Sequence, residues 1–158
     1  MTVAVRRATV DDADGIAAVH IGSWRETYSR LVEPGELDEL SVERRSARWA
    51  TTLAGSDSVW VAEDDGDIVG FAMTTSAPDD GPRPTVLESI YVFGAHHGSG
   101  VGQALLDAAI GDRPAYLFVA ADNPRATRFY ERNGFVFDGV SEEYALVRTP
   151  IVSRRMVR

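Results

Sequence analysis

The sequence contains no cysteine, no lysine and no apolar run long enough to cross a bilayer. Without cysteine the chain has no disulfide, no thiol nucleophile and no thiolate-ligated zinc or iron–sulfur site. The N-terminus has no continuous apolar stretch, and no segment reaches the roughly 18 apolar residues of a membrane span. We therefore expect a cytoplasmic protein with no membrane partner.

Positive charge is scarce as well. All 16 basic residues are arginines, and they face 24 acidic residues, which gives a formal net charge of −8. Nucleic-acid binding depends on neutralising phosphates, so this balance predicts no nucleic-acid partner. The 44% hydrophobic and 25% charged residues are ordinary for a globular protein. A chain of 158 residues is close to the length of one domain, about 150 residues, so we expect residues 1–158 to form a single domain.

Segments of strand and helix character alternate along the chain, which predicts an α/β fold with one mixed sheet and helices on both faces. Asp11 and Asp12 precede the first helical pattern and can cap it. The expected strands span residues 2–10, 59–62, 68–75, 86–93, 116–121, 135–140 and 151–157, and the expected helices span 12–28, 41–53, 100–110 and a segment starting at Asn123-Pro124.

A glycine-dense loop joins the strand expected at 86–93 to the helix expected at 100–110, with the sequence His97-Gly98-Ser99-Gly100-Val101-Gly102. Glycine lets backbone N–H groups approach a ligand closely, and a following helix N-terminus favours an anion. The loop therefore suits a phosphate or pyrophosphate, although a tight turn alone also explains it. The Gly-Lys-Ser/Thr ending of a P-loop is absent, and the alternating glycines do not fit the dinucleotide fingerprint.

A second window runs from Asn123 through Phe129 and Tyr130 to Gly134. Asn123-Pro124 is a strong helix start and Gly134 a strong stop. Phe129 and Tyr130 are about 100° apart around a helix. Either Phe129 is buried while the Tyr130 hydroxyl faces a cleft, or both are packing aromatics with the hydroxyl bonded to the backbone.

Together the two windows resemble the GCN5-related N-acetyltransferase (GNAT) family, which moves an acyl group from coenzyme A to an amine. The family's pyrophosphate loop, commonly Gln/Arg-x-x-Gly-x-Gly/Ala, is matched by the loop at 97–102, with His97 in place of the usual first residue. The family's later motif, Asn-x-x-Ala-x-x-Phe-Tyr followed by Asn-Gly-Phe, is matched by Asn123, Ala126, Phe129, Tyr130, Asn133, Gly134 and Phe135.

The resemblance implies a split sheet, with the pantetheine arm of acetyl-CoA between diverging parallel strands at 87–93 and 116–121. It implies acetyl-CoA as acyl donor, and no metal is expected. Two roles are open for Asn123: it contacts the cofactor, or it serves only as the helix cap. The other implied cofactor-binding residues are the backbone of Ile90, Tyr91 and Val92, and the loop residues His97, Gly98, Ser99, Gly100, Val101 and Gly102.

Amine acetylation needs a neutral amine, a stabilised oxyanion and a proton for the departing thiolate. With no cysteine available, direct transfer in a ternary complex is the simpler mechanism. Tyr130 occupies the family's position for protonating or hydrogen-bonding the coenzyme A sulfur. Glu88 alternates with Val86, Ile90 and Val92 on an expected apolar face that would raise its pKa, which makes it the candidate base. An exposed or arginine-paired Glu88 is the alternative, and His20 is a second candidate base.

The first two expected helices and their connection are the predicted acceptor region. Trp24 and Tyr28 are the candidate substrate-binding residues, with Glu26, Glu33 and Glu36 nearby, because aromatic and acidic groups suit a cationic amine. The acceptor is a small-molecule amine or a peptide N-terminus, and a homodimer stays open. Two other functions stay open too: a non-catalytic coenzyme-A-binding sensor or structural module, and a different nucleotide-binding enzyme that uses the same glycine loop.

Overall fold

In the computed structural model, which describes residues 3–56 and 58–158, strands and helices follow each other in the order predicted from the sequence. Thr2, the expected start of the first strand, lies outside the described residues. The strands are β1 (Val3–Arg7), β2 (Val59–Asp64), β3 (Asp67–Ser76), β4 (Thr85–Val92), β5 (Tyr116–Ala120), β6 (Val136–Ala145) and β7 (Pro150–Val157). The α-helices are α1 (Ala13–Tyr28), α2 (Val42–Gly55), α3 (Val101–Ala109) and α4 (Pro124–Arg132).

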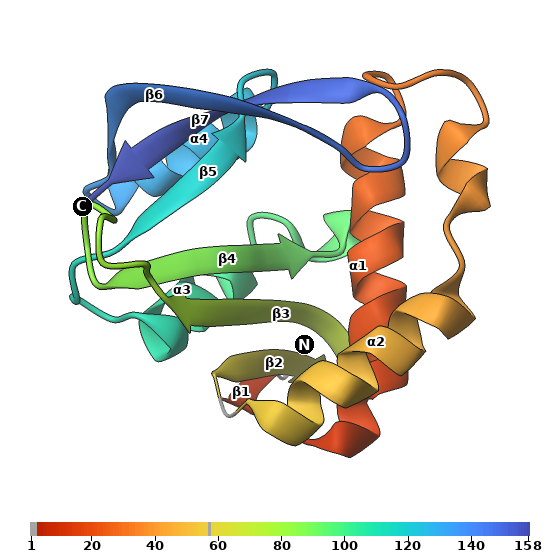
Figure 1. The fold of residues 1–158 in the computed structure, drawn as a ribbon. Coiled ribbons are helices and arrows are strands. Elements are labelled where there is room, and N and C mark those ends of the chain that lie inside the picture. Colours follow the sequence, from red (N-terminus) through yellow and green to blue (C-terminus); the bar gives the residue numbers. More distant parts are fainter. Residues whose placement is uncertain (1–2, 57) are drawn as a thin grey trace.

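The strands form one mixed sheet in the order β1-β2-β3-β4-β5-β7-β6. Every neighbouring pair is antiparallel except β4 and β5, which are parallel and pair only at Val86↔Tyr116. Beyond that single pair the two strands diverge, as Figure 1 shows. The predicted split, mixed sheet is confirmed, and the split creates an unpaired strand edge in the middle of the molecule.

Helices cover both faces of the sheet because each carries an apolar stripe. Helices α1 and α2 pack on one face, where Ile16, Trp49 and Phe71 are in one buried cluster. Helices α3 and α4 pack on the other face, where Leu105 and Tyr130 belong to a second cluster. The divergence of β4 and β5 therefore lies between two helical layers.

Asp12 does not cap α1 with its side chain as the sequence suggested. Its carboxylate accepts hydrogen bonds from the Thr9 backbone N–H at 2.7 Å and from the Arg6 guanidinium at 2.8 and 2.9 Å. A short 3₁₀ turn (Val10–Asp12) separates β1 from α1 and turns the carboxylate back toward that strand. Asp12 therefore ties α1 to the edge of the sheet.

Strand β4 contains a β-bulge that interrupts its alternation. Thr74 of β3 is opposite Leu87 and Met73 is opposite Ser89, which leaves Glu88 as the extra residue. Leu87, rather than Val86, therefore packs in the same cluster as Ile90 and Val92. The predicted apolar face shared by Glu88, Val86 and Ile90 is wrong, because a bulge shifts the side-chain period by one residue.

Candidate functional site

A cavity of about 770 Å³ lies where β4 and β5 diverge. Its lining comes from α1, the start of α2, β4, the glycine loop, β5, α4 and β6. It has two parts. The first is bounded by the glycine loop and α4, and the second by α1, α2 and β6. Residues from the two predicted motif windows meet in the first part.

The glycine loop places a row of unpaired backbone donors at the cavity. Gly98 and Gly100 have positive φ angles of 76° and 91°, which a residue with a side chain rarely adopts. The backbone N–H groups of Gly98, Gly100 and Gly102 make no hydrogen bond to any residue that the structure describes. Val101 and Gln103 share this property. Free N–H groups at a helix N-terminus form an anion-binding site.

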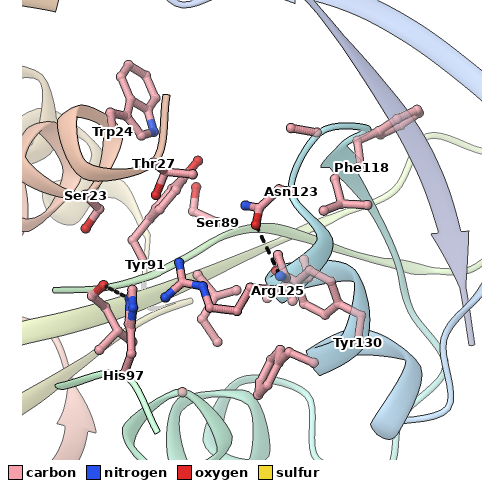
Figure 2. A pocket seen from close by; sticks show the side chains of 18 of the residues that line it. Ser23, Trp24, Thr27, Ser89, Tyr91, His97, Phe118, Asn123, Arg125 and Tyr130 are labelled. Atoms are coloured by element: carbon pink, nitrogen blue, oxygen red, sulfur yellow. Dashed lines mark hydrogen bonds between the residues drawn. The ribbon is translucent and has the colours of Figure 1, made fainter. Parts of the chain in front are cut away.

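Three loop side chains have structural roles. The His97 ring donates from Nε2 to the Val92 carbonyl at 2.9 Å, a bond drawn in Figure 2. The Ser99 hydroxyl donates to the His96 carbonyl. Val101 is buried in the core beneath the loop. These contacts hold the loop against β4 and leave ligand contact to its backbone.

The edge of β4 that faces β5 carries further unpaired backbone groups. Phe93 donates its N–H to Val69 of β3, so alternation turns the backbone groups of Val92 and Ile90 the other way, toward the cavity. The Val92 carbonyl accepts the hydrogen bond from the His97 ring. The Tyr91 side chain points to the α1 face, within 5.4 Å of the His20 ring centroid.

Tyr130 lines the cavity from α4, as Figure 2 shows. Its ring is only 8% exposed and contacts Phe129 and Phe135. Its hydroxyl makes no hydrogen bond within residues 3–56 and 58–158. Burial and the nearby Tyr91 raise the pKa of Tyr130 above its ordinary value, so the hydroxyl keeps its proton as a donor. Tyr130 is the more buried of the aromatic pair, since Phe129 is half-exposed and lines the same cavity.

Asn123 performs the predicted helix cap. Its Oδ1 accepts from the Ala126 backbone N–H at 3.2 Å, and the residue also lines the cavity (Figure 2). The cap uses the carbonyl oxygen and leaves the Nδ2 donor for a second contact. The two roles weighed for Asn123 are therefore compatible.

Sequence reasoning missed three arginines of α4 that line the cavity. Arg125, Arg128 and Arg132 are exposed, and none has a carboxylate partner among the described residues. Arg125 extends from the first turn of α4 into the cavity (Figure 2). Their spacing of three and four residues on a helix that follows Asn-Pro was the available signal. They supply positive charge in an otherwise acidic chain.

Glu88 also lines the cavity, but in different surroundings from those expected. The carboxylate is exposed, and Oε1 accepts from the Thr75 hydroxyl at 2.7 Å. Of the two environments expected for Glu88, the structure shows the exposed one, because the bulge turns the side chain out of the apolar face. Glu142 of β6 is a second carboxylate on the lining, which the sequence did not single out.

His20 lies in an aromatic cluster on the acceptor side of the cavity. Its Nδ1 accepts from the Trp49 indole N–H at 3.1 Å, so its proton is on Nε2. Burial, together with the charges of Arg45 and Arg48, lowers the pKa of His20 to about 3. With Nδ1 occupied and Nε2 protonated, His20 is a structural residue rather than a base.

The low pKa of His20 predicts an acid-sensitive fold. Between its ordinary pKa of 6.5 and about 3, the unfolded chain takes up a proton at His20 and the folded chain does not. Stability from this group is complete above pH 6.5 and declines as the pH falls, by up to about 1.4 kcal/mol per unit. Urea unfolding of the parent and His20→Gln between pH 7 and pH 4 should show the steeper decline in the parent. Parallel curves would contradict this role.

Trp24 and Tyr28 line the acceptor part of the cavity. The Ser23 hydroxyl and the Trp24 indole N–H are buried polar groups without a hydrogen-bond partner in the described part of the chain. Burial raises the pKa of Tyr28 and raises that of Tyr91 to about 12. This part of the cavity is therefore an aromatic chamber with neutral donors.

Glu26 and Glu36, two of the carboxylates expected beside these aromatics, have hydrogen-bond partners elsewhere. Glu26 Oε2 accepts from the Gly94 N–H at 2.7 Å. Glu36 is buried and accepts from Thr149 Oγ1 at 2.7 Å, and from two backbone N–H groups of the β6–β7 connection. Burial opposes ionisation of Glu36, but these bonds keep its pKa below the ordinary value. Glu26, Glu33 and Glu36 do not line the cavity.

A comparison with solved structures places this architecture among the N-acetyltransferases. The structure of PaiA N-acetyltransferase from Thermoplasma acidophilum, solved in complex with coenzyme A, superposes with a TM-score of 0.74. The match covers 98% of each chain at 16% sequence identity. At that identity the likeness establishes the shared fold.

Sequence comparison establishes the family. The model of the acetyltransferase (GNAT) family matches residues 21–135. A probable N-acetyltransferase of Mycobacterium tuberculosis is 29% identical over 99% of this chain and 94% of its own length. A mycothiol acetyltransferase of Propionibacterium freudenreichii is 33% identical over 85% of this chain. That match covers 43% of the mycothiol acetyltransferase's own length. The chain belongs to the GNAT family and is an acetyltransferase. No helix in the described residues is long and apolar enough to cross a membrane.

Proposed function

We propose that this protein transfers the acetyl group of acetyl-CoA to a primary amine, by direct transfer in a ternary complex. One observation carries the proposal: a single cavity joins the free N–H donors of the glycine loop to Tyr130 and to an aromatic chamber. The loop and α4 serve the donor, and the chamber between α1 and β6 serves the acceptor.

The donor's phosphates are assigned to the glycine loop and α4. The free N–H groups of Gly98 and of residues 100–103, at the start of α3, suit an anion. Arg125, Arg128 and Arg132 add charge to the same side of the cavity. The backbone groups of Ile90 on the open edge of β4 suit the amide-rich pantetheine arm, and the Asn123 Nδ2 group supplies a further donor.

Acetyl transfer forms a C–N bond and breaks the thioester C–S bond, while the amine loses a proton and the leaving sulfur gains one. Tyr130, whose hydroxyl is protonated and lines the cavity, donates that proton to the sulfur as the C–S bond breaks. A backbone N–H on the cavity edge of β4 stabilises negative charge on the carbonyl oxygen. Glu88 accepts the proton of the amine through water, held in place by the Thr75 hydroxyl.

Glu88→Gln is expected to lower kcat/KM, and the loss should shrink as the pH rises, because more of the amine is then already neutral. The measurement is kcat/KM from pH 6.5 to 9.5 at saturating acetyl-CoA. Glu142→Gln is the matched control for the pH dependence: it also removes a carboxylate from the cavity lining, so any loss of kcat/KM that it causes should not shrink in this way as the pH rises. A loss that is constant across the pH range would assign Glu88 to binding or packing instead of proton transfer.

Release of free coenzyme A across a panel of amines tests the proposed function itself. We expect acetyl-CoA, but neither ATP nor NAD, to raise the melting temperature, because a ligand that binds only the native state stabilises it. We also expect at least one amine to accelerate release of coenzyme A. Stabilisation without amine-dependent release would identify a non-catalytic coenzyme-A-binding module. Preferential stabilisation by a nucleotide would reject the proposal.

A further inference from the structure

All four arginines that line the cavity are without a carboxylate partner in the part of the chain that the structure describes. Outside the cavity, Arg6, Arg148 and Arg155 each pair with a carboxylate. Arg125, Arg128 and Arg132 are on α4, beside the glycine loop. The fourth, Arg45, is on α2 and lies over the ring of Trp24, which Figure 2 shows across the cavity from α4. The lining therefore has two separate positive regions, and phosphate binding at the loop accounts for one of them.

Arg45 projects into the aromatic chamber from the first turn of α2. Its guanidinium carbon lies 5.1 Å from the centroid of the Trp24 ring, and the residue is half-buried. No hydrogen bond ties its side chain to another described residue, whereas the neighbouring Arg44 donates to the Glu39 carbonyl. Burial and the charge of Arg48 lower the pKa of Arg45. An arginine remains protonated at neutral pH, so the chamber holds a partly desolvated cation with no counter-ion.

The lining of the same cavity adds neutral donors to this charge. The Ser23 hydroxyl is 2% exposed and, like the Trp24 indole N–H, has no partner among the described residues. Buried donors that share a cavity with an unpaired cation match a ligand that carries negative charge and acceptor oxygens.

We infer that the acceptor is an amine that also carries a carboxylate, and that Arg45 binds the carboxylate through its guanidinium. This inference rests on the proposed function and names the acceptor class. The planar guanidinium matches a carboxylate in a bidentate arrangement. The carboxylates of Glu88 and Glu142 on the same lining oppose a dianion such as a phosphate monoester and favour the ammonium end of the substrate.

The geometry also limits the length of the acceptor. The reacting amine is expected near Glu88 and Tyr130. Arg45, in contrast, lies over the Trp24 ring, whose centroid is 6.4 Å from that of the Tyr91 ring. Glu88 and Tyr91 are three positions apart along β4, a span on the order of 10 Å. The substrate panel must therefore vary the spacing between the amine and the carboxylate.

The experiment compares ω-amino acids from glycine to 6-aminohexanoate, and several α-amino acids, each with its carboxamide. O-phosphoethanolamine represents the phosphate class. We expect the best carboxylate to exceed its amide in kcat/KM by about tenfold to a hundredfold, the usual effect of a charged hydrogen bond. Arg45→Gln should abolish this preference mainly through KM, and Arg45→Lys should retain part of it. Arg48→Gln, an equal loss of charge outside the cavity on the same helix, should keep it.

A binding measurement separates this inference from the proposed function. Calorimetric titration of the protein–coenzyme A complex with the N-acetylated acids and their amides requires no turnover. Tighter binding of the acids, lost in Arg45→Gln but not in Arg48→Gln, supports the inference. Equal binding of acids and amides overturns it, as does a preference for the phosphate. Amine acetylation with no carboxylate preference would overturn the inference and leave the proposed function intact, whereas absence of acetylation would reject the function alone.

Discussion

Replacing Tyr130 with phenylalanine is expected to lower kcat by about tenfold to a thousandfold, the usual contribution of one positioned acid. The ring and its contacts with Phe129 and Phe135 remain, so the folded state should be nearly unchanged. Affinity for acetyl-CoA should change little, since the sulfur accumulates negative charge only as the reaction proceeds. Steady-state and single-turnover kinetics measure kcat, and calorimetry measures the affinity.

Tyr116→Phe is the matched control for this experiment. Tyr116 is also a buried tyrosine, but it does not line the cavity. Its variant should keep the parental kcat. If Tyr130→Phe keeps the parental kcat while chemistry limits the rate, Tyr130 is a packing residue and the proposed acid is wrong.

Gly100→Val is expected to weaken acetyl-CoA binding by at least about tenfold. Gly100 has a φ of 91°, so a β-branched residue forces the loop out of its conformation and moves the row of N–H donors. A Cβ atom at this position meets nothing within 4 Å, so backbone strain rather than a clash in the folded chain is the expected cause. Calorimetry with acetyl-CoA and the ligand-induced change in melting temperature measure the effect.

Gly66 offers a control with the same backbone strain. It also has a φ of 91° and open space around its Cβ position, but it is in the turn between β2 and β3 and does not line the cavity. Gly66→Val should lose stability, by about 1 to 3 kcal/mol, and keep the parental affinity for acetyl-CoA. Parental affinity in Gly100→Val would reject the loop as the pyrophosphate site.

Structural features that depend only on residues adjacent in the sequence could be predicted from the sequence. Asn123 caps α4, and Gly134 ends it with a φ of 87°, because capping and positive φ are properties of a few adjacent residues. The glycine loop at 97–102 was located for the same reason. Element ends were less certain: β6 reaches Ala145, five residues beyond its expected end at 140. Its exposed residues carry little apolar periodicity.

The bulge at Glu88, which decides between its two expected environments, could not be predicted. Regular alternation assigns it to the face of Val86 and Ile90, and only its pairing with β3 reveals that it is the bulged residue. A bulge depends on the register of two strands, which a pattern along one strand does not contain. The buried pairing of His20 with Trp49 is likewise a contact between two helices.

The sequence by itself determined the family, the order of the elements and the residues of the glycine loop and of α4, since each is written in short, contiguous motifs. Only the tertiary structure decided what surrounds the reacting groups. The divergence of β4 and β5 opens the cavity, and packing of α1, α2 and β6 around it brings in Arg45, Glu142 and the orphaned donors of Ser23 and Trp24. These residues come from three separate segments of the chain, and their roles arise from burial and from missing partners, which exist only once the chain is folded.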